Sequence, residues 1–194
     1  ELNLVVVSLP EGPDQRRETE RQIPHELMHI LLYQAVGEGY DKLPTWFKEG
    51  VASANELRPN SDYYLVLERA TEQDSLIRLE QLCTSFPQDT SVYLAYAESD
   101  SSTRYLHQKY GSVGLSDLLQ GYARGGGCEY GSQEALGLTL EQLEQDWQRE
   151  VLGESALFNA LVNMLPWLLV LLVAILAPLT LTLTNLRKKD AKKK

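Results

Sequence analysis

The sequence predicts a mainly α-helical domain of the α+β class, with one short N-terminal β element, followed by one C-terminal transmembrane helix. Residues 2–9 (LNLVVVSL) are rich in β-branched side chains, which is typical of a strand. Residues 23–151 carry apolar side chains at helical spacing between glycines and prolines, which indicates a series of helices. Residues 163–185 are mostly apolar and contain no charged side chain, as a helix that crosses a membrane requires.

The predicted helices begin and end at residues with capping or helix-breaking character. The polar residues 10–20 are expected to form a loop or the solvated first turns of a helix. Pro24 suits a first helical turn, where a missing N–H costs little, and Gly37 suits a helix end. Thr139 and Gln142 have the spacing of a capping box. The helical segments expected on this basis are residues 23–36, 44–57, 63–83 in pieces, 93–110, 115–124 and 139–151.

The chain is expected to consist of a folded domain (1–154), a linker (155–162), the transmembrane helix (163–185) and a basic tail (186–194). The six Lys and Arg residues of the tail belong on the cytoplasmic side by the positive-inside rule. We therefore expect a single-pass protein of the cell membrane with its domain on the extracytoplasmic side. The alternative for the apolar run is a buried core helix, which is usually shorter and has a polar face. An exported domain needs a signal peptide, so we expect sequence upstream of Glu1 to be missing.

The part of the chain before the tail is strongly acidic. Subtracting the six basic and one acidic tail residues from totals of 18 and 27 leaves 12 Lys and Arg against 26 Asp and Glu. This balance argues against nucleic acid as a partner, because phosphate binding draws on clustered Lys and Arg. The two cysteines, Cys83 and Cys128, can form a disulfide in an exported domain, and two free buried thiols are the alternative.

An HExxH motif lies in the first predicted helix. Residues four apart project from one face of a helix, so His25 and His29 can place two imidazole nitrogens on one zinc ion. Glu26 then lies near the open coordination position. The alternative is a pair of buried histidines without a metal. Two histidines do not complete a zinc site, so a third protein ligand must come from elsewhere in the chain.

Glu49 is the candidate for that third ligand. It lies 20 residues after His29 in the segment LPTWFKEGVA, on a second helix that is expected to run antiparallel to the first. The alternative is a surface glutamate. However, Trp46, Phe47 and Val51 surround Glu49 in the sequence, which indicates a helix packed into the core.

The two motifs together resemble the gluzincin zinc metallopeptidases, and within them the peptidase MA-like family, whose pattern is HExxH followed by a W-[LF]-x-E-G-x-A segment. This chain has HELMH and then WFKEGVA. Residues 96–111 and 135–147 are similar to later helices of that family, so the resemblance covers about residues 4–151. It implies a zincin-like fold in which the N-terminal strand aligns an extended substrate by backbone pairing.

The resemblance also implies roles for individual residues. One zinc ion per chain would be held by His25, His29 and Glu49, with Glu26 as general base. Tyr96 is suggested as a hydrogen-bond donor to the oxyanion, with ordinary packing as its alternative.

One position departs from the family's pattern. Many gluzincins place an Asp four residues after the ligand Glu to orient a ligand histidine, whereas this chain has Ser53 there. Because such partners fix the tautomer of a ligand histidine, another group must hold His25 or His29.

These residues predict a membrane-anchored zinc metallopeptidase that cleaves a peptide or protein substrate by a zinc-activated water, with Glu26 as general base. Membrane lipid is expected as a partner of the single C-terminal span, and membrane-protein partners stay open. The leading alternative is a catalytically silent zincin-fold membrane subunit or scaffold that acts through protein–protein contacts. A zinc-stabilised binding module is the third, and no Cys or His lies nearby in the sequence to supply the fourth ligand that it needs.

Overall fold

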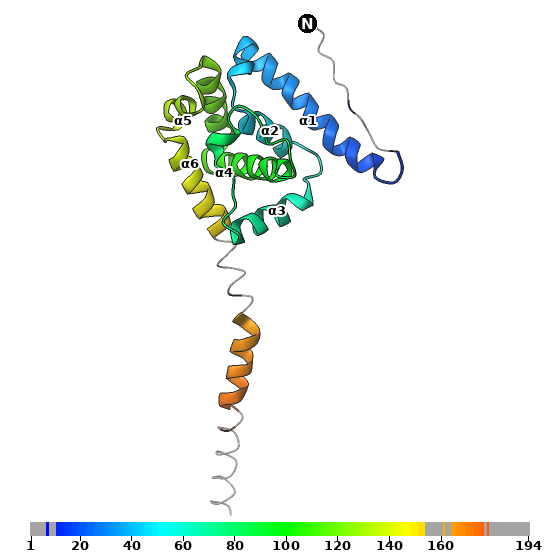
Figure 1. The fold of residues 1–194 in the computed structure, drawn as a ribbon, viewed down its shortest axis with the longest axis vertical. Coiled ribbons are helices and arrows are strands. Elements are labelled where there is room, and N and C mark those ends of the chain that lie inside the picture. The colour runs from blue at the N-terminus through cyan, green and yellow to red at the C-terminus, as the bar shows by residue number, and fades with distance from the viewer. Residues whose placement is uncertain (1–6, 8–10, 154–160, 162–163, 177, 179–194) are drawn as a thin grey trace, which may run out of the picture. The chain divides into compact units, whose positions relative to one another are not determined.

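Helices and turns make up the part of the chain that a computed structural model of the protein describes, namely residues 7, 11–153, 161, 164–176 and 178 (Figure 1). The chain divides into two units, residues 1–152 and residues 153–194. The elements of the first unit are α1 (Gln15–Val36), η1 (Gly37–Lys42), α2 (Thr45–Ala54), α3 (Ser61–Glu72), η2 (Leu79–Leu82), α4 (Val92–Arg124), α5 (Cys128–Leu136), α6 (Leu140–Trp147) and η3 (Gln148–Leu152).

The long helix α4 forms the centre of the first unit, with α1 on one side and α5 and α6 on the other (Figure 1). It packs against α2, α3 and α5. Gly111 has a φ of 68° and interrupts α4, so α4 consists of two helical stretches, in agreement with the two separate helices expected here. The rings of Trp46, Phe47 and Tyr122 pack against one another with centroid distances of 5.3 to 6.2 Å. These aromatic contacts hold α2 against α4 in the core.

Helix α1 begins at Gln15, so most of residues 10–20 form the first turns of a helix, which was one of the two alternatives that the sequence left open. Side-chain pairs four residues apart support its first turns, as between Arg16 Nε and Glu20 Oε1 at 2.7 Å. Pro24 therefore lies inside the helix. The sequence had predicted it in the first turn, and this prediction is wrong. Because Pro24 has no N–H, the carbonyl of Glu20 loses its usual helical donor, and it accepts a hydrogen bond from the backbone N–H of Leu57 at 3.2 Å. This bond attaches the chain after α2 to α1.

Helix α2 lies close against α4 because it has Gly50 at the contact. A Cβ atom at this position would lie 2.2 Å from Thr103 Oγ1 and 2.3 Å from the carbonyl oxygen of Ser99. Both distances are far below van der Waals contact, so the absence of a side chain permits the approach. The close packing at Gly50 also determines where the neighbouring Glu49 lies.

A disulfide between Cys83 and Cys128 joins the segment after η2 to the start of α5. The structure thus has the pair, and not the two free thiols that the sequence left open. Trp46 Nε1 donates a hydrogen bond to Cys128 Sγ at 3.4 Å, which connects the disulfide to α2.

The predicted α+β class is wrong for the part of the chain that the structure describes, because no strand is found there. Val7 is the one described residue of the predicted strand and belongs to no regular element, and the rest of residues 2–9 lies outside the described residues. A run of β-branched side chains creates a local preference, but a strand also needs a partner to complete its hydrogen-bond ladder. The described residues offer no such partner.

The predictions of a transmembrane helix and of a single-pass cell-membrane localisation are also wrong on this structure. Among the described residues, no helix combines the length and the apolar character that a membrane crossing demands. Residues 163, 177 and 179–185 of the predicted span, and the whole tail 186–194, lie outside the described residues.

Candidate metal centre

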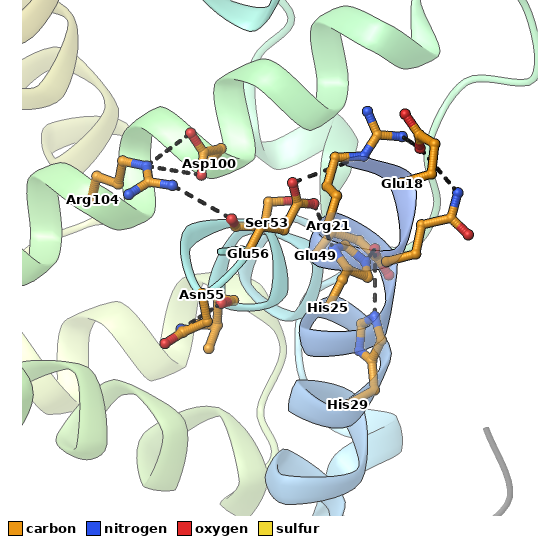
Figure 2. A network of polar contacts seen from close by, with 12 residues as sticks. Glu18, Arg21, His25, His29, Glu49, Ser53, Asn55, Glu56, Asp100 and Arg104 are labelled. Carbon is orange, nitrogen blue, oxygen red and sulfur yellow. Dashed lines mark hydrogen bonds and ion pairs between the residues drawn. The ribbon is translucent and has the colours of Figure 1, made fainter. Parts of the chain in front are cut away.

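His25 and His29 lie one turn apart on α1, and Glu49 approaches them from α2 (Figure 2). Glu49 Oε2 is 3.3 Å from His25 Nε2 and 3.7 Å from His29 Nε2. One ligand atom from each of the three residues lies within 4.8 Å of the other two. The three side chains are between 14 and 19% exposed. The structure therefore brings together the three residues that were predicted as zinc ligands.

The second nitrogen of each imidazole ring has a partner of its own. His25 Nδ1 lies 3.1 Å from Glu56 Oε1, and His29 Nδ1 lies 3.1 Å from the hydroxyl oxygen of Tyr40. Because these contacts occupy both Nδ1 atoms, the two Nε2 atoms are the ones that face Glu49. In zinc sites the ring nitrogen that does not bind the metal usually donates to such a partner.

The carboxylates around the histidines favour positive charge in this cluster. Burial lowers the pKa of His25, but hydrogen bonds to Glu49 and Glu56 outweigh burial and raise the pKa to about 9. Burial raises the pKa of Glu49, but hydrogen bonds to His25 and His29 outweigh it and lower the pKa to about 2. A divalent cation can supply the positive charge in place of the histidine protons. Two imidazole nitrogens and one carboxylate oxygen are ligands that zinc prefers in catalytic sites, so the residues fit a zinc ion.

A cavity of about 340 Å³ is lined by His25, Glu26 and Tyr96 among its residues. The ring of Tyr96, on α4, lies 6.5 Å from the ring of His25 and packs edge to face on Phe86 at 4.9 Å. Burial and the negative charges of Glu49 and Glu26 raise the pKa of Tyr96 to about 12, so its hydroxyl keeps its proton at neutral pH. Both residues predicted to act in catalysis thus line a cavity beside the candidate ligands.

The sequence interpretation missed Glu56 and Tyr40. Glu56 lies two residues beyond the end of α2, so helical spacing does not relate it to Glu49. Tyr40 lies in η1, where no helical spacing relates it to His29. Ser53, at the position where the family often has an Asp, is buried, and its carbonyl accepts a hydrogen bond from Arg104 of α4 at 3.4 Å (Figure 2).

In this helical domain the HExxH helix α1 faces Glu49 of α2, and the three side chains could hold a metal ion. A model of the peptidase MA superfamily matches residues 2–153. The chain therefore belongs to the peptidase MA superfamily.

One curated relative is the uncharacterized protein YhcO of Bacillus subtilis (strain 168), which is 28% identical to this chain over 161 residues. The match covers 78% of this chain and 47% of the relative, so the chain spans about half the length of that protein. No solved structure is similar enough to the chain to count as a match.

Proposed function

We propose that this chain is a zinc-dependent metallopeptidase that hydrolyses peptide bonds. The observation that carries the proposal is the convergence of His25, His29 and Glu49, whose ligand atoms lie within 4.8 Å of one another. Membership of the peptidase MA superfamily supports the same reaction class. A zinc ion held by these residues would polarise a peptide carbonyl and make a water molecule more acidic.

Glu26 is the general base in this proposal. It follows His25 in the chain and lines the same cavity. A carboxylate in this position can accept a proton from a water molecule that attacks the peptide carbonyl carbon, and can then donate that proton to the leaving amine. The transfer needs no further titratable group.

Tyr96 is the proposed donor to the carbonyl oxygen as that oxygen gains negative charge. It reaches the cavity from α4, whereas Glu26 reaches it from α1. A substrate carbonyl could therefore lie between the base and the donor. Because the pKa of Tyr96 is raised to about 12, its O–H is available to donate throughout the neutral range.

The proposal is tested by measuring zinc content and peptide hydrolysis of the full chain. Glu26→Gln should retain about one zinc ion per chain while hydrolysis falls about 10²- to 10⁴-fold, because it removes the base and no ligand. His29→Ala should lose zinc and activity together. Glu38→Gln removes an exposed glutamate of η1 and should change neither quantity.

Full activity of Glu26→Gln, or a wild-type chain that binds no zinc, would refute the proposal. A wild-type chain that binds zinc but cleaves nothing in a broad peptide screen would favour the catalytically silent scaffold.

A further inference from the structure

We propose that Glu56 is a positioning residue that holds His25 through its Nδ1 atom and so directs its Nε2 atom to the metal. This inference deepens the proposed function and rests on it. It concerns the position at which the family often has an Asp and this chain has Ser53. A carboxylate from further along the chain takes that place.

The contacts of Glu56 favour His25 over its other neighbour. Glu56 Oε1 lies 3.1 Å from His25 Nδ1, whereas Glu56 Oε2 lies 4.0 Å from Arg21 Nε. Arg21 already has a closer partner in Glu18, at 2.9 Å. The Glu56 side chain is only 5% exposed, and a carboxylate this buried is costly unless it is paired. The short contact with His25 therefore accounts for its burial better than a loose ion pair with Arg21 does.

The backbone around Glu56 is anchored to α1 next to the histidine. The carbonyl of Glu20, which Pro24 leaves without a helical donor, accepts the N–H of Leu57 at 3.2 Å. Arg58 Nε donates to the carboxylate of the same Glu20 at 2.5 Å. Both contacts are with Glu20, one turn before Pro24, and they fix the segment that carries Glu56, one residue before Leu57. Pro24 in turn directly precedes His25 in the chain.

This placement has a definite consequence for the histidine. A carboxylate that accepts the Nδ1 proton selects the tautomer with a free Nε2 lone pair, fixes the orientation of the ring and increases the basicity of Nε2. His29 has the hydroxyl of Tyr40 at its Nδ1 instead, which carries no charge. We therefore assign the stronger support of the metal centre to Glu56.

The test is the zinc affinity of the full chain, measured by competition with a chromophoric chelator at fixed neutral pH. Glu56→Gln removes the charge, and Glu56→Asp keeps the charge but shortens the side chain by one methylene. Both variants should bind zinc about 10- to 100-fold more weakly than wild type. The visible spectrum of the cobalt-substituted protein should also change, because the imidazole ligand is no longer held in one orientation.

Glu18→Gln is the matched control. Glu18 lies on α1, is largely buried and, like Glu56, contacts Arg21. It should leave zinc affinity within about threefold of wild type, because it removes one negative charge near the site but keeps the contact between Glu56 and His25, and such a screened charge has a small effect on metal binding. A merely structural role of Glu56 would leave the cobalt spectrum unchanged.

Zinc affinity within about threefold of wild type for either Glu56 variant would overturn the positioning role, as would an equal loss in Glu18→Gln. The measured quantity is zinc affinity and not peptide hydrolysis. A chain that binds zinc without cleaving peptides therefore still tests the positioning role, and weaker zinc binding by the Glu56 variants would support it. A wild-type chain that binds no zinc would refute the proposed function and this inference together.

Discussion

Glu98 is a fully buried acid on α4 whose charge should make the fold sensitive to pH. Its side chain is 0% exposed. Its Oε1 atom accepts the backbone N–H of Ile77 at 2.8 Å, and its Oε2 atom is buried without a hydrogen-bond partner among the described residues. Burial raises the pKa of Glu98, the N–H of Ile77 opposes this, and the nearby Glu144 raises it further, to about 8.

The sign of the effect follows from this raised pKa. A group whose pKa is higher in the folded than in the unfolded protein contributes stability below its unfolded pKa and loses it as the pH rises through the folded pKa. For Glu98 the window runs from 4.5 to about 8. Glutamine keeps the oxygen that accepts from Ile77 and never ionises, so Glu98→Gln should become progressively more stable than wild type across this window.

The size of the gain can be worked from the pKa. Each pH unit within the window is worth about 1.4 kcal/mol, so the advantage of Glu98→Gln should grow by about 3 kcal/mol between about pH 5 and about pH 7. This is an upper limit, because local relaxation around the ionised group reduces it. The metal centre is the same in both proteins, so its own titration cancels in the difference.

Urea unfolding followed by the fluorescence of the buried residues Trp46 and Trp147 measures this difference. Glu141→Gln, at an exposed position of α6, is the control for the loss of one carboxylate from the surface of the domain. A constant difference between Glu98→Gln and wild type across the window would refute the reasoning, because it would mean that Glu98 ionises as easily in the folded as in the unfolded chain.

Two further predictions concern residues that shape the site. Gly50→Ala should destabilise the domain by about 1–3 kcal/mol in urea unfolding, because its Cβ would lie 2.2 Å from Thr103 Oγ1 and 2.3 Å from the Ser99 carbonyl oxygen. This loss should exceed the helix preference of alanine over glycine, which is about 1 kcal/mol. A more stable variant would contradict the close approach of α2 to α4. Tyr96→Phe should lower kcat for peptide hydrolysis about 10²- to 10³-fold with zinc affinity unchanged, and an unchanged kcat would leave Tyr96 only its packing against Phe86.

The candidate ligands could be found in the sequence because their relation is largely local. His25 and His29 are one turn apart on any helix, whatever surrounds it. Glu49 could be predicted from the resemblance of its segment to a known pattern and from the apolar residues around it. In each case a short stretch of sequence contains the information.

Glu56 and the course of α1 were missed for one shared reason. Pro24 was interpreted as part of a first turn, which left no reason to expect a free carbonyl at Glu20. In the structure Pro24 lies inside α1, and the carbonyl that it frees binds Leu57. Only this contact between distant segments brings Glu56 to His25, so no local pattern could show it.

The strand and the transmembrane helix were predicted from side-chain composition. Composition indicates which conformation a segment prefers, but it does not show whether the folded chain forms that element. Residues 2–9 have the side chains of a strand, but a strand requires a second strand beside it. Residues 163–185 have the side chains of a membrane helix, but among the residues that the structure describes no helix meets the requirements of a span.

By itself, the sequence predicted the HExxH helix, because His25 and His29 are related by spacing along one helix. It also predicted Glu49 as their partner and the family of the chain, through the resemblance of two short segments to a known pattern. The tertiary structure alone decided how deeply α2 packs at Gly50, that Cys83 joins Cys128, and which groups hold the two histidines. The physical reason is that these contacts join residues far apart in the chain, and their energies depend on burial and on distances that exist only after the helices have packed.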